Sequence, residues 1–314
     1  MGTPTFAVGP LRRLVDEGYH VVGVVTAPDK PAGRGHHLQP SPVKQYALSV
    51  GLPLLQPEKL RDPHFIQALR DLHADLQVVV AFRMLPEVVY AMPPRGTFNL
   101  HASLLPQYRG AAPINHALIH GETLTGVTTF FLDQHIDTGA IIRQVPVPID
   151  PTDNAGTLHD KLMHVGAQTV IDTIDDITRG TVVTQPQHIP DHITLHTAPK
   201  IYRDNCRINW NQSANAIHNL VRGLAPTPTA YTELDLTGNH QTQTVKIYAT
   251  QPLPPAIPHL PPGTLSTDGK TYLHIAANDG MVNILKLQLP GRKPLSTPEL
   301  LRGLRIQPQN TPHT

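Results

Sequence analysis

Runs of β-branched residues alternate with segments of helical spacing through the first half of this chain. HVVGVVTA (20–27), LQVVVAF (76–82) and GTFNLH (96–101) predict strands. PVKQYALSVGL (42–52) and PHFIQALRDLHA (63–74) lie between them and predict helices. Strands that alternate with helices in this way are typical of an α/β fold with a doubly wound, mostly parallel sheet.

The same region continues with two more strands and one long helix. GVTTFFL (126–132) and AIIRQVPVPI (140–149) predict strands, and residues 155–180 predict an amphipathic helix that a glycine ends. After residue 200 the pattern changes to one helix (213–224) and several short strands separated by turn residues. This pattern predicts a small antiparallel β-barrel, of the OB-like kind used for oligonucleotides. We expect a catalytic domain at 1–188, a linker at 189–204 and a barrel domain at 205–314.

Composition limits the class of protein. The single cysteine, Cys206, cannot form an intrachain disulfide, and no apolar run is long enough for a membrane span. We therefore expect a cytoplasmic protein with no membrane partner, and a monomer. The net charge of +1 divides into 10 − 6 = +4 from residue 201 onward and 15 − 18 = −3 before it. The C-terminal part is thus the better candidate for a polyanionic partner, although chance scatter of surface charge explains the same numbers.

Several common sites are absent from the sequence. It has no G-x-x-x-x-G-K-[ST], and GTPTFAVGP lacks the G-x-G-x-x-G spacing, so nothing indicates a nucleoside triphosphate or NAD. His116 and His120 have the i, i+4 spacing of paired metal ligands. They lack an H-E-x-x-H context and a third ligand at useful spacing, so we predict no metal site.

Polar residues end one of the predicted strands. In NLHASLLPQYRGAAPI (99–114), Asn99 and His101 would project from one face of a strand while Leu100 points to the other. Downstream, in LDQHIDTGA (132–140), Asp133 and Asp137 follow another strand. A carboxamide, an imidazole and a carboxylate suit acyl transfer through a tetrahedral intermediate. From residue types alone, however, a structural role is the simpler explanation, in which Asn99 and Asp137 cap turns and His101 is a hydrogen-bonded residue without a catalytic role.

These stretches together resemble folate-dependent formyltransferases. The NLHASLLPQYRGAAPI block and GVTTFFLDQHIDTG (126–139) carry the resemblance, and further matches extend over almost the whole chain. They include TAPDKPAGRG (26–35), APKI (198–201), RINW (207–210) and RGLAPTP (222–228). The resemblance implies the formyltransferase fold, with 10-formyltetrahydrofolate as the formyl donor and no metal. It also implies transfer to the α-amine of methionine carried by initiator tRNA.

The resemblance assigns roles to particular positions. The catalytic set falls on Asn99, His101 and Asp137, and the turn that contacts the folate falls on Ser103, Leu104, Leu105 and Pro106. The loop that reaches the tRNA falls on residues 30–35, where Lys30 and Arg34 supply charge for phosphates. Arg292 and Lys293 are further candidates for tRNA contact in the basic C-terminal part.

The acceptor remains open among relatives that share the catalytic set. A formyltransferase acting on glycinamide ribonucleotide or on an amino sugar, a 10-formyltetrahydrofolate hydrolase with water as acceptor, and a non-catalytic RNA-binding relative are the alternatives. The loop at 30–35 and the C-terminal matches argue against the first of these. An intact Asn99, His101 and Asp137 argue against the last.

One expectation concerns the chain start. A doubly wound sheet needs an apolar strand before its first turn, and the resemblance also implies a short strand before MGTP. We therefore expect the encoded sequence to continue upstream of Met1.

Overall fold

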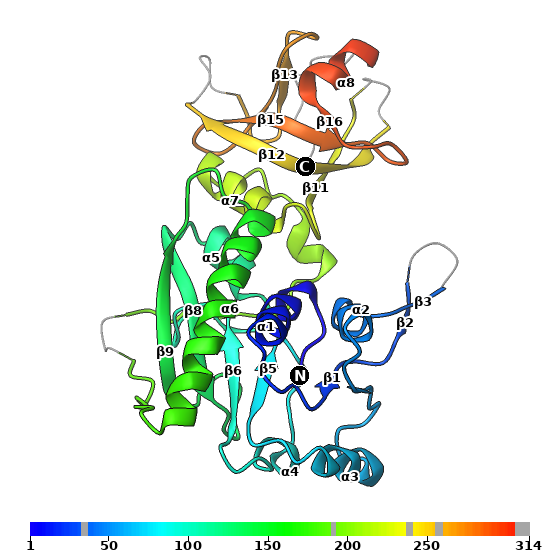
Figure 1. Cartoon of the computed structure of the whole chain (residues 1–314). Helices are drawn as coiled ribbons and strands as arrows, with labels where there is room; N and C mark the ends of the chain where they lie inside the picture. The colour runs from blue at the N-terminus through cyan, green and yellow to red at the C-terminus, as the bar shows by residue number, and fades with distance from the viewer. Residues whose placement is uncertain (33–36, 190–192, 237–240, 255–259, 305–314) are drawn as a thin grey trace. The chain divides into compact units, whose positions relative to one another are not determined.

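The computed structural model describes residues 1–314 except 33–36, 190–192, 237–240, 255–259 and 305–314 (Figure 1). The chain forms two compact units, each described here by itself. Unit 1 comprises Met1–Pro113, Leu124–Pro148 and His159–Pro199, and unit 2 comprises Ile114–Thr123, Ile149–Leu158 and Lys200–Thr314. Along the part of the chain that the structure describes, no helix has the length and apolar character needed to cross a membrane.

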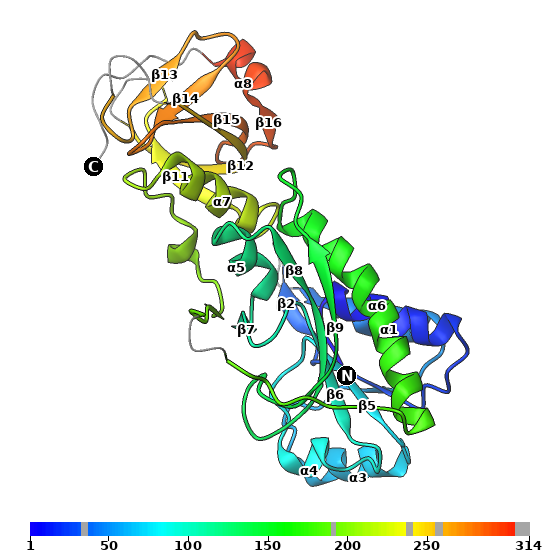
Figure 2. The same ribbon diagram turned by 90° about the vertical axis from the view of Figure 1, so that its left-hand side faces the viewer.

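Unit 1 contains parallel strands extended by an antiparallel hairpin. β1 (Val24–Val25) pairs in parallel with β4 (Leu54–Leu55), and β5 (Gln77–Val80) pairs in parallel with β6 (Thr97–His101). β8 (Leu124–Phe131) runs antiparallel to β6, and β9 (Ile141–Pro148) runs antiparallel to β8 (Figure 2). The predicted α/β architecture is therefore confirmed, with β8 and β9 as its antiparallel extension.

Two helices of unit 1, α2 (Pro42–Ser49) and α3 (Pro63–Asp71), begin where the sequence supplies a side-chain cap. The Ser41 hydroxyl accepts a hydrogen bond from the Lys44 N–H, and Asp62 Oδ1 accepts hydrogen bonds from His64 and Phe65. A proline follows each cap at the first helical position, where its missing N–H costs nothing. The helices are α1 (Thr5–Asp16), α2 (Pro42–Ser49), α3 (Pro63–Asp71), α4 (Glu87–Tyr90) and α6 (Ala155–Arg179), the last starting in unit 2.

The long helix α6 lies against one face of the sheet (Figures 1 and 2). Gly166 in α6 leaves room for Leu100 of β6, since a Cβ at this glycine would lie 2.8 Å from a Leu100 methyl. The hydroxyls of Thr129 in β8 and Thr173 in α6 are 2.8 Å apart and hydrogen-bonded. Because side chains alternate along a strand, the neighbours of Leu100 point to the other face.

Two short strand pairs complete unit 1. β2 (Lys30–Ala32) and β3 (His37–Gln39) form an antiparallel hairpin, while β7 (Arg109–Gly110) pairs in parallel with β10 (Thr197–Ala198). Arg34 lies between β2 and β3, outside the described residues.

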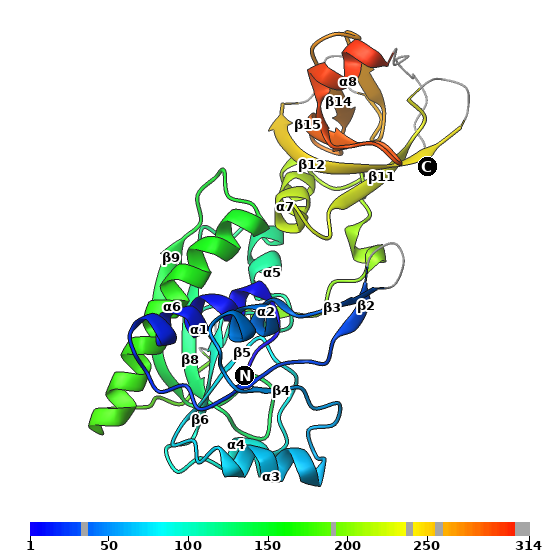
Figure 3. The same cartoon turned by 45° about the vertical axis from the view of Figure 1, so that its right-hand side comes forward.

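Unit 2 contains a curled antiparallel sheet with the strand order β11-β12-β15-β14-β13, and β16 pairs with β15 (Figure 3). Register shifts in the pairing of β12 with β15 around Ala249 help this sheet to curl, and it forms a half-barrel where we predicted a small barrel. The apolar side of α7 packs into the same core as the inner residues of β12 and β15. The elements are α5 (Pro113–Ile119, which begins in unit 1), the 3₁₀ helix η1 (Arg203–Cys206), α7 (Ala214–Leu224), β11 (Ala230–Leu234), β12 (Gln243–Leu253), β13 (Leu265–Thr267), β14 (Leu273–Ala276), β15 (Met281–Gln288), β16 (Leu295–Ser296) and α8 (Thr297–Gly303).

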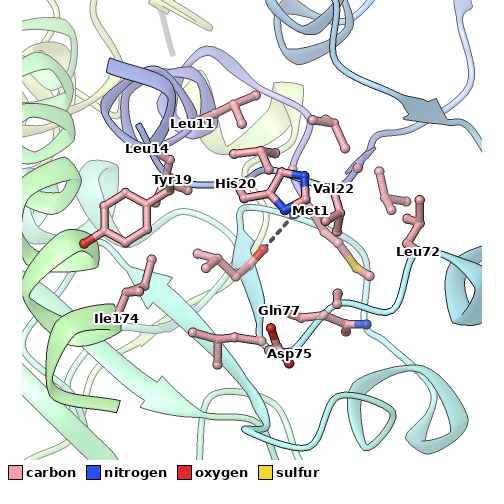
Figure 4. A pocket seen from close by; sticks show the side chains of 18 of the residues that line it. Met1, Leu11, Leu14, Tyr19, His20, Val22, Leu72, Asp75, Gln77 and Ile174 are labelled. Atoms are coloured by element: carbon pink, nitrogen blue, oxygen red, sulfur yellow. Dashed lines mark hydrogen bonds between the residues drawn. The ribbon is translucent and has the colours of Figure 1, made fainter. Parts of the chain in front are cut away.

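A largely apolar cavity of about 530 Å³ in unit 1 lies between the edges of β1 and β5 (Figure 4). Met1 lies in its wall, where the terminal ammonium donates a 2.6 Å hydrogen bond to the Val78 carbonyl. Gly2 donates to the Val25 carbonyl on one side, and Val80 donates to the Met1 carbonyl on the other. Met1 and Gly2 thus bridge the two strand edges only at one end of the cavity. Residues 20–23, which we expected to be strand, line the cavity instead of pairing in the sheet.

The hydrogen-bond register shows what this cavity can accept. Val80 N–H and Val78 C=O point to Met1, so the alternation of a parallel ladder points Val78 N–H and Leu76 C=O into the cavity. On the opposite edge, the same alternation presents Gly23 C=O and Val25 N–H. The cavity therefore has the backbone groups to hold one extended segment parallel to both strands.

We predict that an apolar, β-branched segment of about five residues joined in front of Met1 will raise the thermal unfolding temperature by several degrees, because it fills the cavity and pairs with both edges. Differential scanning calorimetry checks this. A Gly-Ser segment of equal length is the control, and equal unfolding temperatures for the two would contradict the prediction.

Burial also lowers the pKa of the Met1 ammonium from 8.0 to about 5. The unfolded chain therefore binds more protons between these pH values, and stability falls with falling pH in this range. The apolar segment should remove this slope.

Candidate active site

β6 positions two polar side chains on the face of the sheet opposite α6. Asn99 pairs with Val79 of β5 and Phe130 of β8, and His101 pairs with Thr128 of β8. Pairing on both sides fixes the register of β6, so Asn99 and His101 share the face that Leu100 avoids. The predicted placement of Asn99 and His101 is confirmed by this register.

His101 is held by the loop that follows it. Its Nε2 is 2.8 Å from the Tyr108 carbonyl oxygen, and its side chain is only 7% exposed. Because a carbonyl only accepts, this bond requires a hydrogen on Nε2. The neutral imidazole then carries its lone pair on Nδ1.

Asp137 faces that lone pair. Its Oδ2 lies 3.8 Å from His101 Nδ1 and accepts a 2.9 Å hydrogen bond from the Gly110 N–H. The carboxylate side chain is 13% exposed, and its residue has a φ of 55°, which is uncommon for a non-glycine residue. A proton taken up at Nδ1 would form an ion pair with this carboxylate. The other acidic residue of the loop, Asp133, accepts instead from Thr138 and the His135 N–H, so it caps the loop.

Asn99 presents an unused acceptor. Its Oδ1 is buried and receives no hydrogen bond from any residue that the structure describes. An unpaired buried amide oxygen costs about 1–3 kcal/mol. A ligand N–H at this position would satisfy the atom, so the site suits a substrate that brings an amine or amide hydrogen.

Side chains of β8 and β9 hold the turn at Ser103–Pro106 by hydrogen bonds. The Thr128 hydroxyl donates to the Ser103 carbonyl at 2.7 Å and accepts from the Leu105 N–H at 3.2 Å. Gln144 Nε2 donates both to the Leu105 carbonyl and to the Thr128 hydroxyl. The Leu105–Pro106 peptide is cis. Ser103 and Leu105 are buried, whereas Leu104 and Pro106 are partly exposed, and the Ser103 hydroxyl donates to the Gln107 carbonyl.

Sequence reasoning missed the side chains that hold these loops. Thr128 and Gln144 support the turn, and Gln187 contacts the loop that carries Asp137. The one available signal was a polar residue inside the apolar run GVTTFFL, since strand pairing places Thr128 beside His101. Gln187 carried no signal, because it comes from a segment remote in sequence.

The predicted basic contacts fall in both units. In unit 1, Lys30 is exposed at the start of the β2–β3 hairpin, and Arg34 is outside the described residues. In unit 2, Arg292 and Lys293 are exposed in the turn between β15 and β16.

Among the residues that the structure describes, no three His, Cys, Asp or Glu side chains lie close enough together to hold a metal ion. His116 lies on α5 and His120 in the turn that follows it, with ring centroids 5.9 Å apart.

Comparison with known families identifies the class of protein that has this fold and site. Residues 1–174 match the family described as "Formyl transferase", and residues 200–305 match "Formyl transferase, C-terminal domain". The chain belongs to the formyl transferase family.

Three relatives with high sequence identity are methionyl-tRNA formyltransferases. The chain is 58% identical to the methionyl-tRNA formyltransferase of Bacteroides fragilis over 98% of this chain and 94% of that protein. It is 57% identical to that of Bacteroides thetaiotaomicron over 98% and 95% of the two chains. It is 54% identical to that of Parabacteroides distasonis, over 97% and 94%.

Solved structures share the fold at low identity. One is a sugar 3N-formyl transferase crystallised in the presence of dTDP and 5-N-formyl-THF, with a TM-score of 0.62, 20% identity, and coverage of 93% of this chain and 97% of that one. Another is an N-formyltransferase from Helicobacter canadensis in complex with folinic acid and dTDP-3-aminofucose, with a TM-score of 0.61, 21% identity, and coverage of 90% and 96%.

We predict that Thr128→Val will lower the free energy of unfolding by about 1–3 kcal/mol, because it leaves the Leu105 N–H and its neighbours without their shared hydroxyl. Urea denaturation measures the change. Thr129→Val is the matched control: its hydroxyl points to α6, where Thr173 still donates to the Thr169 carbonyl. If both variants lose the same free energy of unfolding, the bonds from Thr128 to the turn make no special contribution and the prediction is wrong.

Proposed function

We propose that this protein transfers the formyl group of 10-formyltetrahydrofolate to the α-amino group of methionine on initiator methionyl-tRNA. The observation that carries the proposal is the convergence of Asn99, His101 and Asp137 in a chain 58% identical to a methionyl-tRNA formyltransferase. The product is the formylated initiator tRNA, which serves the initiation of translation.

Asn99 stabilises charge on the formyl oxygen. When the amine attacks the formyl carbon, the carbonyl oxygen becomes an oxyanion, and the Asn99 amide N–H is a neutral donor for it. The unpaired Asn99 Oδ1 accepts from an N–H of the substrates and so orients the carboxamide. One side chain thereby recognises both the nucleophile and the developing charge.

His101 and Asp137 handle the proton of the attacking amine. With Nε2 bonded to the Tyr108 carbonyl, Nδ1 is the nitrogen that can take up a proton. The resulting imidazolium lies 3.8 Å from Asp137 Oδ2, which stabilises its charge. Return of this proton to the departing folate nitrogen completes the transfer without a covalent enzyme intermediate.

The two substrates are held by different parts of the chain. We assign the folate to the turn Ser103, Leu104, Leu105 and Pro106, where the partly exposed Leu104 and Pro106 offer side-chain contact. We assign the tRNA backbone to Lys30 and Arg34, with Arg292 and Lys293 in unit 2. Holding both substrates makes the attack effectively intramolecular, which supplies part of the acceleration.

Three further assignments belong to this proposal. The catalytic domain spans 1–188, a linker 189–204, and the tRNA-binding β-barrel domain 205–314. The protein acts in the cytoplasm. It acts as a monomer.

We expect Asn99→Ala and His101→Ala to lower kcat by about 10²–10³-fold, since each removes a group that acts in the transition state. Asp137→Asn, which keeps the shape of the side chain, should also lower kcat strongly while the protein folds normally. The measurement is transfer of labelled formyl to methionyl initiator tRNA, with an amino sugar and water as alternative acceptors. Transfer to either alternative in place of the tRNA would refute the proposed acceptor, and near-normal turnover in the variants would refute the roles.

We expect Arg34→Ala to weaken tRNA binding and to reduce the slope of log K against log salt by about 0.7–0.9, the contribution of one phosphate contact. Charge reversal at Arg292 and Lys293 should flatten the slope further. Folate titration of the same variants is the control and should change little. Equal losses for tRNA and folate would mean that these residues support the fold and do not contact the tRNA.

A further inference from the structure

The loop that carries Asp137 leaves the sheet at the wrong end for His101. β8 runs antiparallel to β6, so Phe131 at the end of β8 lies opposite Phe98, whereas His101 lies opposite Thr128. The difference is three residues, or about 10 Å along a strand. The connection from β8 to β9, residues 132–140, therefore has to fold back over the face of the sheet before the Asp137 carboxylate can lie 3.8 Å from His101 Nδ1.

The backbone of this loop is tightly constrained. Asp137 has a φ of 55°, a conformation that costs a non-glycine residue free energy and persists only when its surroundings hold it. Two residues later, a Cβ on Gly139 would lie 1.7 Å from the Phe131 carbonyl oxygen, so the return of the chain to β9 requires a glycine.

One side chain holds both ends of this bend. Gln187 Nε2 donates 2.9 Å hydrogen bonds to the Asp137 carbonyl and to the Gly139 carbonyl. Gln187 Oε1 accepts from Arg109 Nε at 3.2 Å and from Arg109 Nη2 at 2.6 Å. The two hydrogens and both lone pairs of the amide are therefore used. A rotated amide would place its hydrogens against the guanidinium and its oxygen against the two carbonyls, so this orientation is the only favourable one.

The partners of Gln187 are themselves fixed. Arg109 belongs to β7, and the next residue, Gly110, donates its N–H to the Asp137 carboxylate. Two residues before Gln187, Gln185 forms a pair of backbone hydrogen bonds with Ile141 at the start of β9. Gln187 thus joins the loop after β8 to the loop after β6, and Asp137 lies between them.

We propose that Gln187 is a positioning residue for catalysis, which holds the Asp137 carboxylate against His101 by binding the two loop carbonyls and Arg109. The proposal rests on the catalytic role assigned to Asp137 under the proposed function. It requires glutamine and not glutamate, because only the amide donates to the carbonyls while accepting from the guanidinium.

The test compares substitutions that separate these two halves of the amide. Gln187→Met keeps the length of the side chain but removes all four hydrogen bonds. Gln187→Glu keeps the oxygen that accepts from Arg109 but loses both hydrogens that donate to the loop carbonyls. Gln185→Met is the matched control, because its exposed side chain lies two residues away and its contact with Ile141 is through the backbone. Formyl transfer from 10-formyltetrahydrofolate to methionyl initiator tRNA gives kcat and both KM values, and calorimetry gives the unfolding temperature.

We expect Gln187→Met and Gln187→Glu each to lower kcat by about 10–100-fold with little change in either KM, since small misplacement of a catalytic group has an effect of this size. Gln185→Met should match the unsubstituted protein. Adding Gln187→Met to Asp137→Asn should lower kcat no further, because both changes remove the same contribution. If Gln187→Met lowers the unfolding temperature, Gln187→Glu is the variant to compare, because it keeps the bonds from Arg109 and loses only the two bonds to the loop carbonyls.

Three results would overturn the inference. Unchanged kcat in both Gln187 variants, with Asp137→Asn inactive, refutes the positioning role and leaves the proposed function intact. Independent, multiplying losses in the double variant show that Gln187 acts other than through Asp137. Full turnover in Asp137→Asn refutes the role of Asp137 under the proposed function, and the inference with it.

Discussion

The double pairing of β6 is the constraint on which the site in unit 1 depends. β6 is hydrogen-bonded to β5 on one edge and to β8 on the other, so a slip of one residue would break both ladders and turn Leu100 away from α6. The apolar packing of Leu100 against Gly166 therefore also fixes the direction in which Asn99 and His101 point. Burial on one face of the sheet determines the chemistry on the other.

The loops around these two residues are held mainly by neutral hydrogen-bonding side chains. Thr128 and Gln144 hold the turn at Ser103–Pro106, and Gln107 bonds the segment at Thr194 and His196. Each of the two glutamines bridges two groups, and a reversed amide would place like atoms against each other, so these contacts favour one orientation of each amide.

The sequence predicted the parts of unit 1 that depend on local patterns. Strand alternation was sufficient to put Asn99 and His101 on one face. The helical spacing of apolar residues, with the terminal glycine of α6, delimited α2, α3 and α6 within a few residues. Gln187 could not be predicted, because its partners Asp137, Gly139 and Arg109 are about 50 to 80 residues away along the chain. The strand expected at 20–27 shrank to Val24–Val25, since pairing needs a neighbour and residues 20–23 face the cavity. The strand propensity of a segment depends on its own residues, whereas a strand forms only when a second segment pairs with it.

The same distinction explains why the proposed catalytic carboxylate was the hardest residue to place. Asp133 and Asp137 occupy equivalent surroundings in the sequence, each in a polar stretch after an apolar strand. In the structure Asp133 binds its own loop through Thr138, and Asp137 binds a different loop through the Gly110 N–H. A positive φ at Asp137 turns its side chain inward, and this conformation is stable only because distant groups satisfy the backbone on either side of it. Residue types alone left Asp133 and Asp137 unseparated and only the family resemblance favoured Asp137, because the direction of its side chain depends on tertiary contacts to its backbone.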